Sequence, residues 1–234
     1  MTPDPPRPNN EASNSHGPPH SDFEGADPRA PIANDRTHFV VTALLFELGL
    51  GGLAVLLGWL IGYDPLRWNH SASVTTTQAA AMGFVAAFPP FAALVLLQTR
   101  TPIRLKPFVE YCDRLLVPLF SRLTIAEFGL LSIAAGIGEE VLFRGLLQGA
   151  FDQWVGDSDG ALLGLVLSSI IFGGCHYLNK TYAVLATVAG FYLGILYLIS
   201  DHLLVPIVAH ALYDFGALVY VTKKRRPELI RPPH

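Results

Sequence analysis

The sequence predicts an all-α membrane protein, a polytopic helical bundle of about six transmembrane helices that follows a disordered N-terminal tail. The first observation is composition, because the 234 residues are 51% hydrophobic and only 15% charged, whereas soluble domains carry about 25% charged residues. The second is that apolar runs of membrane-spanning length recur from Phe39 onward, since about 20 residues cross the hydrocarbon layer. The third is that basic residues gather in alternate connecting segments, as in multi-pass membrane proteins.

The same composition excludes some classes of function. A net charge of −3 is too weak to indicate a nucleic-acid partner. Two cysteines cannot form a disulfide framework. The expected partner is therefore the lipid bilayer, and the oligomeric state is left open.

Residues 1–37 differ from the rest of the chain. They are rich in proline and polar residues and carry only scattered apolar side chains. Such a segment buries too little surface to offset its conformational entropy, so we expect a disordered tail. It also lacks the apolar core of a signal peptide. Residues 38–222 then form the predicted transmembrane domain, and residues 223–234 a basic cytoplasmic tail.

Each apolar segment is predicted to be a helix, because backbone polar groups in lipid must be satisfied within the segment. The six predicted spans cover residues 39–62, 79–98, 126–149, 160–178, 181–199 and 203–221. The Pro89-Pro90 pair should kink the second span. The long 99–125 connection contains apolar positions with Arg114 and Arg122 nearby, which predicts an interfacial amphipathic helix.

Basic residues set the predicted orientation. With a cytoplasmic N-terminus, nearly all of them fall inside: Arg7, Arg29, Arg36, Arg100, Arg104, Lys106, Arg114, Arg122, Lys180, Lys223, Lys224, Arg225, Arg226 and Arg231. Arg67 falls outside, and Arg144 lies within a span. This positive-inside pattern predicts a multi-pass protein with both termini in the cytoplasm, and we expect the cell (inner) membrane as its location.

Charged groups inside a bilayer are costly and require a reason. Here they concentrate on three of the predicted spans: Glu139, Glu140 and Arg144 on the third, His176 on the fourth, and His210 and Asp214 on the sixth. Their concentration indicates a functional site.

The spacings within this set are helical. Glu140 and Arg144 are four residues apart, so a salt bridge is geometrically easy. Glu139 points about 100° away from Glu140 on a helix, which leaves it less well paired and suited to act as a general base. His210 and Asp214 are also four apart, so Asp214 can orient the imidazole or share a ligand with it.

Three motifs follow one another along these spans: Glu139-Glu140-x-x-x-Arg144, Phe172-x-x-x-His176 and His210-x-x-x-Asp214. Together and in this order they resemble the motifs of the CPBP intramembrane protease family, also called Abi. This family includes the type II CAAX prenyl endopeptidases and bacteriocin-processing or immunity proteins. The resemblance covers roughly residues 124–221 and implies an all-helical membrane fold that hydrolyses peptide bonds in a polar cavity.

The resemblance also implies a role for each residue. Glu139 would work with His176 to activate water, and Glu140 and Arg144 would brace that pair. His210 would stabilise the oxyanion or help to hold the water, with Asp214 as its neighbour. The prenyl endopeptidases usually have Asn in place of Asp214. An ionised Asp cannot donate a hydrogen bond to an oxyanion, so orientation of His210 or metal ligation fits Asp214 better.

The residues leave two chemical routes open. A carboxylate and two imidazoles can supply a base, an oxyanion stabiliser and a proton for the leaving amine, which describes a glutamate-dependent protease. A zinc ion held by His176, His210 and a carboxylate is the metalloprotease alternative. The ligands lack the compact His-Glu-x-x-His spacing, so no cofactor is firmly predicted.

Other readings of the polar residues remain. The cluster can serve a non-proteolytic membrane scaffold or bacteriocin-immunity-type protein, or a small carrier, although no inverted repeat supports the carrier. Glu47 in the first span belongs to no motif, so pairing with a neighbouring helix or snorkelling is expected of it. Cys175 and Ser168 are interpreted as packing or surface residues rather than nucleophiles.

Overall fold

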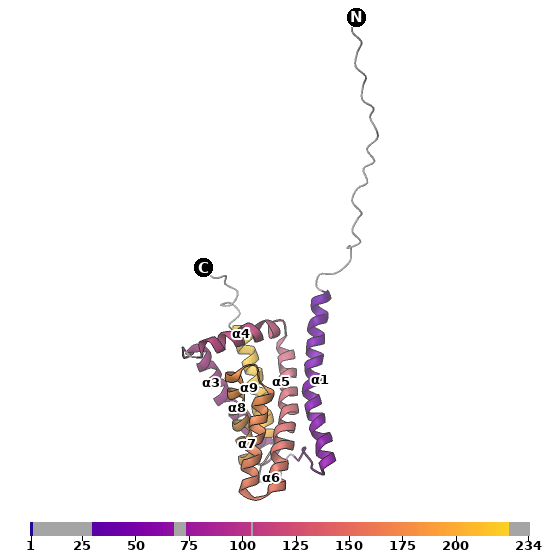
Figure 1. Ribbon diagram of the computed structural model, residues 1–234, viewed down its shortest axis with the longest axis vertical. Coiled ribbons are helices and arrows are strands. Elements are labelled where there is room, and N and C mark those ends of the chain that lie inside the picture. The colour runs from indigo at the N-terminus through magenta and orange to yellow at the C-terminus, as the bar shows by residue number, and fades with distance from the viewer. Residues whose placement is uncertain (2–29, 68–73, 104, 225–234) are drawn as a thin grey trace.

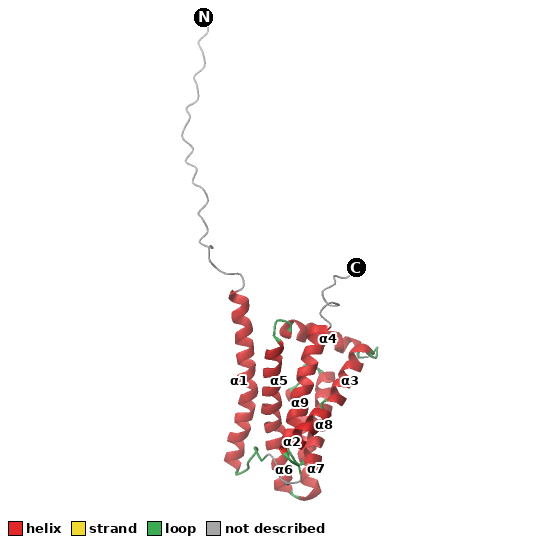
Figure 2. Ribbon diagram, turned by 180° about the vertical axis from the view of Figure 1, so that it is seen from behind, coloured by secondary structure: helices red, strands yellow, loops and turns green. Residues whose placement is uncertain are grey.

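The structure is a computed structural model that describes Met1 and residues 30–67, 74–103 and 105–224. Helices account for all the regular elements of these residues, and Figure 2 shows helices joined by loops without a strand in the described part. The prediction of an all-α bundle is confirmed.

Helices are present at each of the six predicted spans. In chain order the elements are α1 (Ala30–Ile61), α2 (Thr76–Ala86), α3 (Phe88–Thr99), α4 (Lys106–Phe120), α5 (Ile125–Glu140), the π-helix η1 (Val141–Gln148), α6 (Gly149–Val155), α7 (Asp157–Cys175), α8 (Lys180–Ser200), α9 (Leu204–Val219) and the π-helix η2 (Tyr220–Lys224). The second span is therefore built from α2 and α3, and the third from α5, η1 and α6.

Not all of these helices are long and apolar enough to cross a membrane by themselves. Among the described residues four are: Asp35–Ile61, Thr76–Thr99, Lys180–Ser200 and Leu204–Thr222. A fifth is obtained if α4 and the Ile125–Val155 segment, bent by 112°, are counted as one broken span, and the apolar part of α7 is shorter. The predicted third span is less apolar than these four helices, because it contains Glu139, Glu140 and Arg144. The chain is a multi-pass membrane protein.

The predicted kink at Pro89-Pro90 is a break between two helices. α2 ends at Ala86, and Pro89 and Pro90 lie in the first turn of α3. Proline has no backbone N–H, so it is tolerated in the first turn of a helix but not in its interior. The Tyr192 hydroxyl donates to the Ala86 carbonyl at 2.7 Å, which satisfies one oxygen freed at this break.

α4 forms within the segment where an interfacial helix was expected. It lies across one end of the bundle, at a steep angle to the helices beneath it (Figure 1). α1 begins and α9 ends at this same end (Figure 1).

α1 starts at Ala30, earlier than the predicted tail boundary at residue 37. The Arg36 guanidinium donates to both Glu127 oxygens at 2.7 Å, which ties this early turn to α5. Residues 2–29 of the predicted tail lie outside the described residues, as do residues 225–234 of the predicted basic tail.

α5 packs between α1 and α9 and holds the bundle together (Figure 1). Its glycines permit this packing. A Cβ on Gly136 would lie 2.9 Å from the Ile207 carbonyl oxygen of α9, and a Cβ on Gly138 would collide with the Glu47 carbonyl of α1. Because both helices approach the last turns of α5 so closely, that end of α5 is the natural place for side chains of three helices to meet.

Candidate active site

The structure brings all six predicted site residues together. Glu139 and Glu140 end α5, Arg144 lies in η1, and His176 follows directly after α7. His210 and Asp214 lie on α9. The pairwise contacts described below connect residues up to 70 positions apart in the chain.

Glu140 is the centre of a buried polar network. Its Oε1 accepts hydrogen bonds from Arg144 Nη1 at 2.8 Å and from His210 Nδ1 at 2.7 Å. Arg144 Nη2 donates to the Gly190 carbonyl of α8 at 2.8 Å. Both the Glu140 and Arg144 side chains are 0% exposed. A fully buried charge is tolerated only when it is paired and hydrogen-bonded, so this network fixes the charges of the site.

η1 sets the position of Arg144. π-helical turns are rare and occur frequently at functional sites. Four residues after Arg144, Gln148 Nε2 donates to the Gly194 carbonyl at 3.0 Å. Two side chains four apart on η1 therefore bond to two carbonyls four apart on α8, and this pairing holds the two elements in register.

Glu139 and His176 face each other without touching. His176 Nε2 lies 3.7 Å from Glu139 Oε2, which is too long for a direct hydrogen bond. His176 Nδ1 lies 2.8 Å from the Phe172 carbonyl. Because a carbonyl only accepts, Nδ1 carries the hydrogen, and in the neutral ring Nε2 then presents a lone pair. Glu139 Oε2 is buried and has no hydrogen-bond partner among the described residues.

His210 is held between two carboxylates. Its Nδ1 contacts Glu140, and its Nε2 lies 3.4 Å from Asp214 Oδ2. The Asp214 side chain is 33% exposed, whereas that of His210 is 8% exposed. The ring is therefore fixed in orientation, with each nitrogen directed at an acidic oxygen.

Phe172, the first residue of the second motif, contacts both imidazoles. Its ring stacks on His176 with centroids 4.4 Å apart and meets His210 edge-on at 6.1 Å. The Arg144 guanidinium carbon lies 4.9 Å from the Phe172 ring centroid, within the range of a cation–π contact. One apolar ring thus contacts both imidazoles and the guanidinium.

The contacts add one feature that the motifs do not imply. Glu140 bonds to both Arg144 and His210, whereas the resemblance gives Glu140 and Arg144 the role of bracing the Glu139–His176 pair. The motif reasoning also missed Gln148, a polar residue four positions after Arg144, and the Gly190 carbonyl. The spacing of Gln148 was a usable signal, whereas nothing in the sequence marks a backbone carbonyl.

The donor set does not fit a zinc ion. Within the part of the chain that the structure describes, no group of three or more His, Cys, Asp or Glu side chains could hold a metal ion. The chemistry of the residues explains this, because both ring nitrogens of His210 are directed at carboxylates. His176 Nε2 and Glu139 Oε2 are then the two predicted ligand atoms that these contacts leave free to bind a metal.

The alternative nucleophiles lie elsewhere. Ser168 and Ser169 both donate to the Leu165 carbonyl of their own helix, at 3.3 Å and 2.6 Å, which is a packing arrangement. Cys175 is exposed and adjacent helical positions do not face each other.

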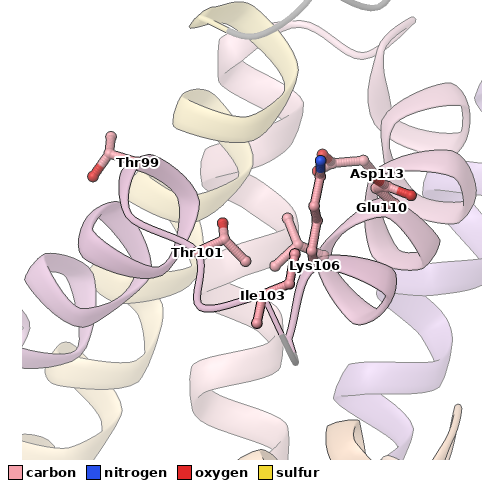
Figure 3. Close-up of a pocket in the computed structure, with 7 residues that line it drawn as sticks. Thr99, Thr101, Ile103, Lys106, Glu110 and Asp113 are labelled. Carbon is pink, nitrogen blue, oxygen red and sulfur yellow. The ribbon is translucent and has the colours of Figure 1, made fainter.

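Two cavities lie away from these six residues. A polar one of about 430 Å³, at the junction of α3 and α4, is lined by Thr99, Thr101, Ile103, Lys106, Val109, Glu110 and Asp113 (Figure 3). An apolar groove of about 540 Å³ runs between α2, α3 and α8 beside Tyr192 and Leu196. Neither is lined by a candidate site residue, so neither changes the assignment of the site.

Comparison with known proteins supports the resemblance drawn from the motifs. Residues 121–216 match the family model described as type II CAAX prenyl endopeptidase Rce1-like, and this range contains all six site residues. At the level of the family, the match supports a CAAX-protease-like membrane endopeptidase.

One curated relative is similar over part of the chain. The "Uncharacterized protein YpbD" of Bacillus subtilis (strain 168) is 32% identical over 99 residues, which are 41% of this chain and 46% of that protein. The aligned part of the chain therefore spans about half the length of the curated relative it matches. No solved structure matches.

Proposed function

We propose that the protein is an intramembrane endopeptidase that hydrolyses a peptide bond of a peptide or membrane-tethered protein, with a water molecule activated by Glu139 and His176. One observation carries this proposal. A carboxylate oxygen and an imidazole nitrogen, both hydrogen-bond acceptors, face each other at 3.7 Å. A water between them can donate one hydrogen to each, and this polarises its oxygen toward a substrate carbonyl.

The remaining residues complete the reaction. Glu139 takes a proton as the water oxygen bonds to the carbonyl carbon, and the carbonyl oxygen becomes an oxyanion. His210, when protonated, stabilises that negative charge, and Glu140 and Asp214 in turn stabilise the protonated imidazole. The C–N bond then breaks, and the proton held by Glu139 passes to the leaving amine. No covalent enzyme intermediate is needed.

Asp214 acts through His210 in this scheme. Its ionised carboxylate accepts a hydrogen bond but cannot donate one to the oxyanion. The contact to His210 Nε2 supports a role in orienting the ring. We therefore assign Asp214 as a positioning residue.

The mechanism requires no metal, and this part of the proposal rests on the donor set. Of the predicted zinc ligands, His210 is directed at Glu140 and Asp214, which leaves His176 and one carboxylate, whereas a catalytic zinc site uses three protein ligands. The proposed enzyme is a glutamate-dependent protease.

We propose the cell (inner) membrane as its location, with both termini in the cytoplasm. The positive-inside pattern supports this orientation. The position of the start of α1 and the end of α9 at the same end of the bundle also agrees with it (Figure 1).

The test uses the purified full chain in detergent and a peptide library. Glu139→Gln, His176→Ala and His210→Ala should each lower cleavage by at least about a hundredfold, because each removes an acid–base or oxyanion group. Cys175→Ser, next to His176 but exposed, is the matched control and should cleave normally. Thermal unfolding checks that all variants are folded.

Three other results have clear meanings. Normal cleavage by all three variants would overturn the assigned site. A wild type that cleaves nothing but binds a partner protein, with binding unaffected by the same substitutions, would favour a scaffold or immunity-type protein. Solute flux into proteoliposomes would favour a carrier.

A further inference from the structure

Glu47 is a carboxylic acid in the middle of α1, outside the matched range 121–216. Its neighbours Leu45 and Leu48 are 69% and 52% exposed, as expected for side chains that face lipid. Glu47 is half-buried, and its Oε2 is buried without a hydrogen-bond partner among the described residues. The carboxyl group is therefore directed into protein rather than into lipid.

The crossing of α1 and α5 places Glu47 beside the site. A Cβ on Gly138 would collide with the Glu47 backbone carbonyl, and a Cβ on Gly51 would lie 3.4 Å from Gly138 Cα. The two helix backbones thus touch one residue before Glu139. Glu47 interacts electrostatically with Glu139, and also with His210 and Asp214 on α9.

The electrostatics of this arrangement are unfavourable if every acid is ionised. Glu140 is neutralised by Arg144 and His210, and Asp214 is partly exposed and contacts His210. Glu47 and Glu139 each retain a buried oxygen without a partner in the described structure. An unpaired carboxylate in an apolar setting is costly, and two neighbouring carboxyl groups lower that cost by sharing a proton.

Building on the proposed function, we propose that Glu47 is a positioning residue for Glu139: the two carboxyl groups share one proton, directly or through one water, and this keeps Glu139 Oε2 directed at His176 Nε2. The groups that face the pair are His210 and Asp214 on α9, Glu140 on α5 and His176 directly after α7. Glu47 itself does not touch the scissile bond.

The first experiment measures cleavage kinetics against pH for wild type, Glu47→Gln and Leu48→Ala. Glu47→Gln should lower kcat by about tenfold with little change in KM, because a base displaced by a fraction of an ångström loses rate rather than binding. The acid limb of its pH profile should move down by about one unit, because a neighbouring acid no longer favours the proton on Glu139. Leu48→Ala should match wild type.

A second experiment does not depend on activity. Infrared spectroscopy of the full chain in lipid nanodiscs follows the C=O stretch of protonated carboxyl groups. A shared proton requires that Glu47→Gln and Glu139→Gln each remove or shift the same band, and that the double variant adds nothing further. Leu48→Ala should leave the band in place.

The outcomes separate the two proposals. Coupled bands in a wild type that cuts no peptide would support the shared proton and count against the proposed protease. Normal kinetics and an unchanged pH profile in a folded Glu47→Gln variant would overturn the inference. Bands that respond independently to the two substitutions would overturn it as well.

Discussion

At the residue scale, the Glu140–Arg144 pair shows how burial changes the worth of an ion pair. Replacing Arg144 by Met keeps an unbranched side chain but leaves Glu140 with one fewer partner at a site that is 0% exposed. Breaking a buried pair from one side costs about 3–5 kcal/mol. We expect Arg144→Met to lower the free energy of unfolding by about this amount, measured by reversible unfolding in detergent.

The chain provides its own control for this prediction. Arg114 and Glu110 have the same spacing and an N–O distance of 3.5 Å, but their side chains are 78% and 49% exposed. Exposed pairs contribute little to stability, so Arg114→Met should unfold like wild type. Equal losses in the two variants would show that the effect of Arg144 is not due to its buried charge.

A second prediction concerns Asp214. An Asn side chain can still accept a hydrogen bond from His210 Nε2 through its amide oxygen, whereas Ala cannot. If Asp214 positions the ring, Asp214→Asn should keep kcat within about tenfold of wild type and Asp214→Ala should lose about a hundredfold. Cleavage assays on the two folded variants measure this ratio, and equal rates in both would remove Asp214 from the mechanism.

Spacing along the chain predicted only part of the residue contacts. The two i,i+4 pairs, Glu140 with Arg144 and His210 with Asp214, follow from helix geometry and are present. The contact between His210 and Glu140 joins residues 70 positions apart and depends on how α5 and α9 pack. Local periodicity contains no information about that packing, so the sequence did not predict this contact.

At the scale of elements, glycines decide how closely α1 and α5 approach. Gly138→Ala would place a methyl group against the Glu47 carbonyl, which is backbone and cannot rotate away. Overpacking of this kind costs about 1–3 kcal/mol. We expect Gly138→Ala to lower the unfolding free energy by that amount and to reduce activity, because Glu139 is the next residue.

Gly129 lies on the same helix with no atom within 4 Å of its Cβ position. Gly129→Ala should therefore be neutral or stabilise the protein by about 0.5–1 kcal/mol, since Ala is the better helix former. Unfolding measurements on both variants make the comparison. Destabilisation by Gly129→Ala of the same size would mean that an added methyl group on α5 is unfavourable even without the α1 contact, and that this contact does not explain the first result.

Element boundaries were predictable where a residue imposes them and not elsewhere. Pro89 and Pro90 lack backbone N–H groups, and the helix is interrupted just before them, between α2 and α3. The π-helical turns of η1 carry no such marker, because residues such as Val141 and Leu142 are compatible with an ordinary helix. α1 extends back to Ala30, and its contact with Glu127 through Arg36 is a tertiary interaction that composition cannot reveal.

At the scale of the whole molecule, hydropathy and charge asymmetry were sufficient for the class of fold. Each predicted span is helical. The number of helices that cross the membrane is harder to predict. The third segment contains the charged residues Glu139, Glu140 and Arg144, and the apolar part of α7 is short. The ionisable residues that form the site are thus also the residues that make the third segment less apolar than the other predicted spans.

The arrangement of the helices leads to the last prediction, on topology. The start of α1 and the end of α9 lie at one end of the bundle (Figure 1), which requires an even number of crossings, and the basic residues favour the cytoplasm for that end. A fluorescent protein that matures only in the cytoplasm should therefore fluoresce when fused to either terminus. A phosphatase active only in the periplasm should be active when fused after Gly156, between α6 and α7, and inactive when fused after Arg122, between α4 and α5. An active phosphatase at Arg122 would invert the bundle, and fluorescence from one terminus alone would mean that α7 or the α5–α6 segment does not cross.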